Sequence, residues 1–463
     1  DLLKKLSKEN DLYEPIQHNL TDEQQAAIAA LALSGIEFSD ETTRYYPEKN
    51  IGSQLIGFVG SDGEKKVGRY GVESAFEKIL AGTQGYIKAS KDASGNLIAS
   101  GAQFWEPAVD GSDVVLTINR AVEYEACRQL DEWVQLHGAS GGSVVITNPT
   151  TGAIIAMCGN PDFDPNTFNT VTDVSTFANA ATQNTYEPGS VFKPLTMAAA
   201  INEEKVTPET TFTDTGSVKV GSFTIKNSDN KAHGVQTMNQ VLEESLNTGA
   251  IFAMQQIGPA KFYEYLVGFG FGQKTGFGLS EGAGNISALK SGKDIYAMTG
   301  SFGQGLTVST LQLVNAYGAI ANGGKLMKPY IIDQVRGPNG TVETTKPEKI
   351  RDIVSPKTAS TVGAMLVNVV EKGHGKRAGV PGYYVAGKTG TAQIPDPNGS
   401  GYLENVTIGT FAGFAPVEDP KFAMVVRVDR PKDVQFAESS AAPLFGKIAK
   451  FLLSYYHVAP TRK

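Results

Sequence analysis

The sequence is poor in the features that mark metal sites. It has only two cysteines, Cys127 and Cys158, in 463 residues and no CxxC or Cys/His cluster, which argues against a structural zinc site. Its histidines stand singly and form no HExxH, so we expect no metal and no cofactor. The two cysteines could form one disulfide, but two buried thiols are the favoured interpretation.

Long apolar runs and basic clusters are also lacking. No stretch approaches the roughly 18 apolar residues that a membrane-spanning helix needs, and no signal peptide is visible. The chain has 41 basic and 48 acidic residues, a formal charge of -7, and no Lys/Arg-rich run. Nucleic acid is therefore not expected as a partner.

The length and texture of the chain predict several domains. A single core rarely grows to 463 residues, so two or three domains are expected. Residues 1–45 are charged and helical in pattern, with Thr21 as a helix N-cap and Glu23 in the first turn. From 44 to 107, short β-like runs alternate with glycine turns, which indicates a small α+β region.

The larger part of the chain has the pattern of an antiparallel sheet covered by helices. A helix is expected over 120–136, and two apolar β runs flank the turn at 148–152, which predicts a hairpin at the centre of a sheet. Further patterns follow in order: helices over 190–204, 236–256, 258–269 and 308–322, strands over 382–387, 406–416 and 421–429, and an amphipathic C-terminal helix.

One short stretch combines a serine and a lysine at the start of a helix. In TYEPGSVFKPLTM, Pro194 is tolerated only near a helix start, so the first turn lies close to Ser190. Lys193 then lies on the same face and could take the serine proton if burial and a neighbouring cation keep it neutral. Alone, the pattern is weak, because Ser190 could simply be a small polar residue that starts a helix. SxxK also occurs at Ser228/Lys231 and Ser287/Lys290, which we interpret as loop positions.

Serine acyl enzymes of this type need two further motifs, SxN and KTG. KTG occurs at Lys274-Thr275-Gly276, in a glycine-rich connection, and at Lys388-Thr389-Gly390, at the end of a β run. A peptide substrate needs an edge strand with open backbone groups, which favours the second copy. SxN occurs three times. Ser245-Leu246-Asn247 between two helical stretches is preferred, and the alternatives are Ser94/Asn96 and the literal Ser228-Asp229-Asn230, which has the composition of a polar turn.

The segments YEPGSVFKP, SLNTGAIFAM and AGKTGTAQ resemble the three active-site motifs of class B penicillin-binding proteins. The resemblance extends from about Arg44 to the end of the chain. It implies a multidomain α+β protein, with an N-terminal pedestal (dimerisation-like) domain over 1–112 and a penicillin-binding transpeptidase domain over 113–463. The latter would have a central antiparallel sheet flanked by helices.

The resemblance also implies a role for each motif residue. Ser190 would attack the penultimate D-Ala of a peptidoglycan stem peptide and form an acyl-enzyme, with Lys193 as general base. Ser245 would relay a proton to the leaving amine, and Asn247 would hold Lys193 and the substrate amide.

The KTG strand would bind the substrate. Lys388 would lower the pKa of Lys193 and attract the substrate carboxylate, which Thr389 and Thr391 would bind, with Gly390 between them. The backbone N–H groups of Ser190 and Thr391 would form the oxyanion hole.

As a family expectation, the protein cross-links stem peptides and is acylated by β-lactams. YEPGSVFKP and the segment FAGFAPVEDPKFAMVVRVDRP are more similar to the septal (division or sporulation) type than to the elongation type. The implied partners are a membrane glycosyltransferase and division proteins, and the implied location is the extracytoplasmic face, held by a single-pass anchor that this sequence lacks. His374, where the family often has Thr, is interpreted as a surface loop residue.

Two other functions remain open at this point. A β-lactamase or β-lactam sensor carries the same three motifs but has no need of a pedestal of about a hundred residues. A non-catalytic division scaffold would not need intact motifs.

Overall fold

The computed structural model describes residues 14–88, 104–396 and 401–462 apart from Asn19 and Glu64, together with Leu3, Ser7 and Gly399. These residues fall into two compact units, 1–47 and 48–463. In the first unit, helix α2 (Asp22–Ala29) begins at Thr21, which forms a capping box with Gln24. The predicted N-cap is confirmed. Residues 30–45 contain turns and irregular chain but no helix, so the helical pattern predicted there is wrong.

The second unit opens with short strands and single helical turns, as the glycine turns predict. These elements are α3 (Ser53–Ile56), β1 (Phe58–Asp62), β2 (Lys65–Arg69), α4 (Gly71–Ala75), α5 (Glu77–Leu80), β3 (Tyr86–Lys88) and β4 (Phe104–Glu106). Strands β1 and β2 pair antiparallel, as do β3 and β4. The SxN candidate Ser94/Asn96 lies outside the described residues.

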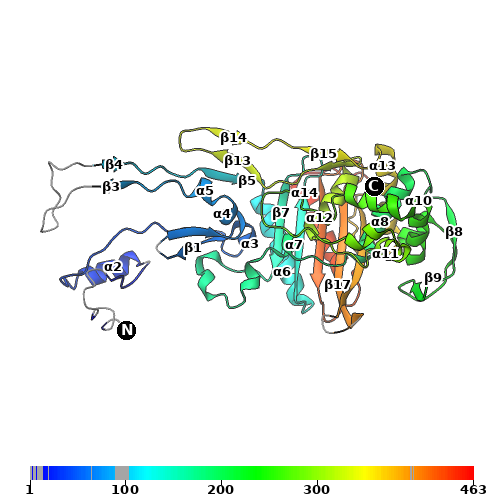
Figure 1. The fold of residues 1–463 in the computed structure, drawn as a ribbon, viewed down its shortest axis with the longest axis horizontal. Coiled ribbons are helices and arrows are strands. Elements are labelled where there is room, and N and C mark those ends of the chain that lie inside the picture. The colour runs from blue at the N-terminus through cyan, green and yellow to red at the C-terminus, as the bar shows by residue number, and fades with distance from the viewer. Residues whose placement is uncertain are drawn as a thin grey trace. The chain divides into compact units, whose positions relative to one another are not determined.

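A five-stranded antiparallel sheet forms the centre of this unit (Figure 1). Its strands, from one edge to the other, are β16 (Ala386–Pro395), β17 (Tyr402–Ala415), β18 (Phe422–Asp429), β6 (Gly141–Thr147) and β7 (Ile154–Asn160). The predicted antiparallel sheet and the 148–152 hairpin are therefore confirmed, although the strand predicted over 382–387 begins only at Ala386.

Helices cover both faces of the sheet. Because successive side chains of a strand point to opposite faces, Val144 and Ile146 pack in the core that holds α6 (Arg120–Leu136) and α14 (Ala441–Tyr455). Val145 packs in the other core, with α8 (Lys193–Asn202), α12 (Thr310–Ala321) and α13 (Pro356–Glu371). The sheet flanked by helices is thus confirmed.

The remaining elements complete the flanks. They are β5 (Asp113–Leu116), α7 (Ala180–Gln183), β8 (Thr211–Asp214), β9 (Ser217–Val220), β10 (Phe223–Lys226), β11 (Gly234–Thr237), α9 (Met238–Glu243), α10 (Asn247–Gly268), α11 (Asp294–Gly300), β12 (Lys325–Met327), β13 (Ile332–Arg336), β14 (Val342–Thr344) and β15 (Lys349–Asp352). Helix α10 is interrupted at Gly258 and Pro259, where the two predicted helical stretches meet. In the described part of the chain, no helix combines the length and apolarity needed to cross a membrane.

Strand β7 lies at an edge of the sheet, so the prediction that its hairpin is central is wrong. Two of its outward backbone groups are nevertheless bonded. The N–H of Asn119 donates to the carbonyl of Ile155 (2.9 Å), and the carboxylate of Glu123 accepts from the N–H of Met157 (2.7 Å). Covered in this way, an edge strand is buried like an inner one, and its side chains have the same apolar pattern.

The two cysteines are bonded to each other, so the expectation of two free thiols is wrong. Cys127 on α6 and Cys158 on β7 form a disulfide with their Cα atoms 5.3 Å apart. They are separated by 31 residues in the sequence, and only the packing of α6 against β7 brings them together. The sequence offers no local signal for that contact.

Removal of this disulfide should destabilise the second unit. A cross-link across 31 residues restricts the unfolded chain and contributes about 3–4 kcal/mol in the chain-entropy account. We expect the double variant Cys127→Ala/Cys158→Ala to lose about that much free energy of unfolding, measured by denaturant titration. The wild type under a reducing agent is the control and should unfold at the same midpoint as the variant. A variant as stable as the oxidised wild type would contradict this expectation.

Candidate active site

Ser190 lies on a tight turn that leads directly into α8. A 3₁₀ turn over Gly189–Phe192 precedes the helix, and Gly189 has a φ of 62°, which favours glycine. Lys193 is the first residue of helix α8, and its side chain is fully buried, whereas Ser190 is partly exposed. No hydrogen bond joins the Ser190 hydroxyl to Lys193 among the bonds of the described residues, so the two are neighbours along one face rather than a bonded pair.

The structure brings Ser245 between two buried lysines. The ammonium group of Lys193 donates to the carbonyl oxygen of Ser245 and, at 3.2 Å, to its hydroxyl. The ammonium group of Lys388 donates to the same hydroxyl at 2.9 Å. Ser245 has a φ of 57°, an unusual conformation for a residue other than glycine, Asn or Asp. Such strain persists where the surroundings fix it, and here the two lysines provide that constraint.

Lys388, Thr389 and Gly390 lie on β16, an edge strand of the sheet. Lys388 is fully buried, and its ammonium group also donates to the carbonyl of Thr389 (3.1 Å). The hydroxyl of Thr391 accepts from the N–H of Ala437 (2.9 Å). The other KTG copy lies in a loop, where Glu281 accepts from the N–H groups of Thr275 and Gly276 (both 2.8 Å).

The literal Ser228-Asp229-Asn230 forms a polar turn outside the lysine pair. Asp229 pairs there with His233 at 2.9 Å. The turn is nevertheless close to the preferred SxN, because the side-chain amide of Asn247 donates to the carbonyl of Lys226 (2.8 Å). A bond from Asn247 to Lys193, expected from the sequence, is not among the hydrogen bonds of the described residues.

A buried network that the sequence did not suggest fixes the start of α10. Asp214 on β8 accepts from the hydroxyl of Thr248 and from the side-chain amide of Asn227, both at 2.8 Å. Asn227 in turn accepts from the N–H of Thr248 (3.2 Å). These residues hold the turn that carries Ser245 and Asn247. Their spacing in the sequence contains no recognisable signal.

Glu187 is a second residue that the motif analysis passed over, although it stands inside YEPGS. Its carboxylate accepts from the N–H of Gly305 (3.1 Å) and from the hydroxyl of Tyr402 (3.0 Å). Burial raises the pKa of Glu187. It therefore ties the SFGQG turn and β17 to the segment that carries Ser190.

The electrostatics of the lysine pair follow from burial. Burial, and then the charge of Lys388, holds the pKa of Lys193 well below its ordinary value. Burial also lowers the pKa of Lys388 to about 7. Two ammonium groups sharing one hydroxyl in a buried site disfavour each other's charge, so the pair favours one neutral and one charged lysine. Lys193 is the one more readily neutral.

His374 forms an ion pair with Glu438 at 3.2 Å, and both side chains are exposed. Its interpretation as a surface loop residue is therefore confirmed.

Among the described residues, one group of Cys, His, Asp or Glu side chains brings three ligand atoms together, namely Glu123, Cys127 and Cys158. It lies at β7, on the opposite edge of the sheet from Lys388.

Comparison with known families gives two matches. The model of the penicillin binding protein transpeptidase domain matches residues 142–450, and the model of the penicillin-binding protein dimerisation domain matches residues 1–116. Stage V sporulation protein D of Bacillus subtilis is 36% identical over 454 residues, 97% of this chain and 69% of that protein. Penicillin-binding protein PbpB of Mycolicibacterium smegmatis is 35% identical over 428 residues, 90% of this chain and 65% of that protein. The chain thus spans about two thirds of the length of these relatives.

Solved structures of penicillin-binding proteins are similar to this chain in fold. Penicillin binding protein 3 of Mycobacterium tuberculosis, in complex with aztreonam, has a TM-score of 0.80 and 32% identity and covers 90% of this chain and 92% of that one. Penicillin Binding Protein 2X of Streptococcus thermophilus has a TM-score of 0.83 and 26% identity over 98% of this chain and 70% of that one.

The contact between β16 and the Ser190 turn leaves no room for a side chain at Gly390. A Cβ there would lie 2.8 Å from the carbonyl oxygen of Pro188 and 2.9 Å from Val191. We expect Gly390→Ala to separate the strand from the turn and to cost about 1–3 kcal/mol of unfolding free energy, measured by thermal unfolding. Gly268→Ala is the matched control, because its Cβ would meet only one atom, at 3.7 Å. Equal melting temperatures for the two variants would contradict this packing.

Proposed function

The chain belongs to the penicillin-binding proteins with a dimerisation and a transpeptidase domain, and from this we propose that it is a serine D,D-transpeptidase that cross-links peptidoglycan stem peptides. The observation that carries the proposal is the Ser245 hydroxyl shared by two buried lysines beside the Ser190 turn. Relatives named as probable peptidoglycan D,D-transpeptidases support the reaction.

Acylation begins at Ser190 in this proposal. Its hydroxyl attacks the carbonyl carbon of the penultimate D-Ala, and Lys193 takes the hydroxyl proton. The depressed pKa of Lys193 supports this role, because only a neutral amine accepts a proton. The N–H groups of Ser190 and Thr391 stabilise the developing oxyanion, and each such donor contributes about 3 kcal/mol.

Departure of the terminal D-Ala needs a proton on its nitrogen. Ser245 is bonded to Lys193 and Lys388, and it passes the proton from Lys193 to the leaving amine. An amine of a second stem peptide then attacks the acyl-enzyme by the reverse sequence, which restores the free serine and forms the cross-link. Asn247 orients the substrate amide.

Substrate is held along β16. As an edge strand, it offers backbone groups to an extended peptide. Lys388 attracts the terminal carboxylate, which Thr389 and Thr391 bind by hydrogen bonds, and Gly390 lets the strand approach the Ser190 turn. A β-lactam, which resembles D-Ala-D-Ala, acylates the same serine.

The cellular setting is part of the proposal. Relatives named for sporulation and for FtsI-type transpeptidases favour a septal role. Residues 1–112 form the pedestal and 113–463 the transpeptidase domain, on the extracytoplasmic face of a membrane to which a single-pass segment holds the protein. A membrane glycosyltransferase and division proteins are its partners, and no nucleic acid or cofactor takes part.

A β-lactamase of the same chemistry is the alternative candidate, and the match to a dimerisation domain at 1–116 weighs against it. A chromogenic cephalosporin separates the two. Stable stoichiometric acylation is expected, whereas rapid multiple turnover would favour the β-lactamase.

Labelling by penicillin should depend on one serine. We expect intact-mass analysis with benzylpenicillin to show one adduct per chain, mapped to the peptide that contains Ser190, and none in Ser190→Ala. Ser245→Ala should lower the rate of acylation by about 10²–10⁴-fold, the usual contribution of a proton relay. A wild type without an adduct would favour the non-catalytic scaffold.

Ser228→Ala is the matched control for both variants, because Ser228 belongs to both an alternative SxxK and an alternative SxN pattern. It should label at the wild-type rate. If Ser228→Ala slowed acylation as much as Ser245→Ala, the assignment of the SxN partner to Ser245 would be wrong.

The rate of acylation should depend on pH through both lysines. It should rise as Lys193 loses its proton and fall as pH rises through about 7, where Lys388 loses the charge that attracts the carboxylate. In Lys388→Arg the guanidinium stays charged, so this fall should vanish even if the rate is lower throughout. The measurement is the second-order rate constant of penicillin acylation over a pH series. A fall that persists in Lys388→Arg would contradict the assignment.

A further inference from the structure

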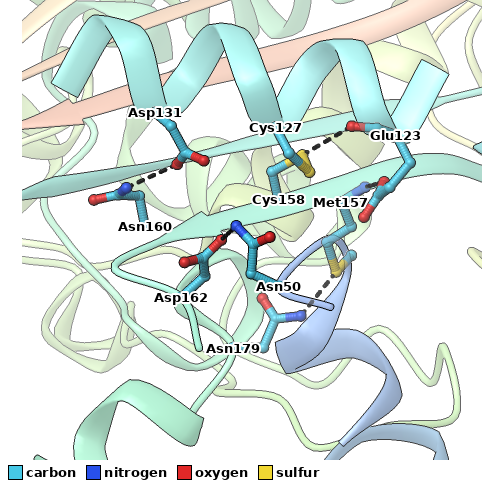
Figure 2. Close-up of a disulfide and its surroundings, with 9 residues drawn as sticks. All are labelled: Asn50, Glu123, Cys127, Asp131, Met157, Cys158, Asn160, Asp162 and Asn179. Carbon is cyan, nitrogen blue, oxygen red and sulfur yellow. Dashed lines mark hydrogen bonds between the residues drawn. A yellow bond between two sulfur atoms is a disulfide. The ribbon is translucent and has the colours of Figure 1, made fainter. Parts of the chain in front are cut away.

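A buried carboxyl group lies beside the disulfide, at the edge of the sheet opposite the proposed active site (Figure 2). Glu123, in the first turns of α6, is only 3% exposed, and Cys127 and Cys158 are 6% and 2% exposed. One carboxylate oxygen and the two sulfur atoms all lie within 4.8 Å of one another. This cluster plays no part in the transpeptidase chemistry.

Half of this carboxyl group has no structural role. One oxygen caps the backbone N–H of Met157, but the other, Oε1, is buried without a hydrogen-bond partner in the described residues. Gly52 covers it, since a Cβ there would lie 3.4 Å from Oε1. A glutamine would cap Met157 equally well, and an unpaired buried oxygen is costly. The second oxygen therefore calls for another explanation.

The chemistry of the disulfide supplies one. Bonded sulfur atoms carry no proton to share, whereas opening the bond releases a thiolate into an apolar site, where a charge is strongly disfavoured. A carboxylic acid within reach of both sulfur atoms can neutralise it. We propose that Cys127–Cys158 is a reversible thiol–disulfide exchange site for a dithiol reductant, with Glu123 as its proton donor and acceptor.

The exchange balances as follows. A thiolate of the dithiol attacks one sulfur atom, the protein S–S bond breaks, and the other cysteine leaves as a thiolate that takes the Glu123 proton. The second thiol of the dithiol gives its proton to the Glu123 carboxylate and displaces the remaining cysteine, whose thiolate is protonated from solvent. Two electrons pass to the protein, the reductant becomes a disulfide, and Glu123 ends protonated.

The surroundings keep Glu123 in the acid form. Burial raises its pKa to about 8, an effect larger than the lowering caused by the hydrogen bond from the N–H of Met157. The other carboxyl groups of this edge are Asp131, bonded to Asn160, and Asp162, bonded to Asn50 (both 2.8 Å; Figure 2). Ahead of α3, Glu48 pairs with Arg120 at 2.7 Å. No cation bonded to Glu123 is present in the described residues to hold it ionised.

The rate of reduction by dithiothreitol tests the proposal, followed by trapping of free thiols and mass analysis of the full chain. At concentrations where the rate is linear in dithiol, the wild type should react at least about tenfold faster than Glu123→Gln near neutral pH. This ratio should fall toward one above about pH 8, where Glu123 has lost its proton. A ratio that stays constant or rises with pH would overturn the proposal. A structural role of Glu123 would open the site further as its buried carboxyl group ionises, and the ratio would then rise rather than fall.

Asp131→Asn is the matched control. It removes another partly buried carboxyl of α6 whose pKa burial also raises, but one that is bonded to Asn160 rather than close to both sulfur atoms. It should follow the wild-type pH profile. If Asp131→Asn changed the profile as Glu123→Gln does, the effect would belong to the helix and the assignment of Glu123 would fail.

Discussion

The arrangement of the candidate active site depends on two lysines that donate to the same hydroxyl group, that of Ser245. Lys193 and Lys388 are fully buried, and both donate to Ser245, while no carboxylate pairs with either in the described part of the chain. Burial disfavours charge on both groups. It holds the pKa of Lys193 well below its ordinary value and lowers that of Lys388 to about 7. The lowered pKa of Lys193 supports its proposed role as a base. Ser245, which both lysines bond, has a φ of 57°, and the buried Asp214 network fixes Thr248 three residues further along the chain.

The two edge strands of the sheet, β7 and β16, differ in what lies beside their outward backbone groups. An edge strand exposes unpaired N–H and C=O groups and invites another chain to pair with it. At β7, Asn119 and Glu123 bond two of these groups, the carbonyl of Ile155 and the N–H of Met157. At β16 the edge strand carries the KTG motif.

Periodicity and punctuation were enough to predict most of the fold. The helix over 120–136 and the 148–152 hairpin appear with nearly the expected bounds, because their apolar faces and turn residues are local properties. Helix α13 is absent from the expected elements, although Ser355 caps it and a proline follows. The edge position of β7 and the disulfide could not be predicted, since both depend on α6 docking, which leaves no periodic signal.

The motif patterns alone do not identify which copy of each motif belongs to the candidate site. The sequence holds three SxxK, two KTG and three SxN patterns, but a proton relay needs the groups of one copy of each within bonding distance. Lys274-Thr275-Gly276 is bound by Glu281, and Ser228-Asp229-Asn230 is a hydrogen-bonded turn. Both are polar loop segments satisfied locally. The copies that contain Lys193 and Lys388 differ in this respect. Neither lysine has an acidic partner in its own segment among the described residues, and both donate to the Ser245 hydroxyl instead. Residues left unsatisfied by their own segment are therefore better candidates for chemistry than residues that merely match a pattern.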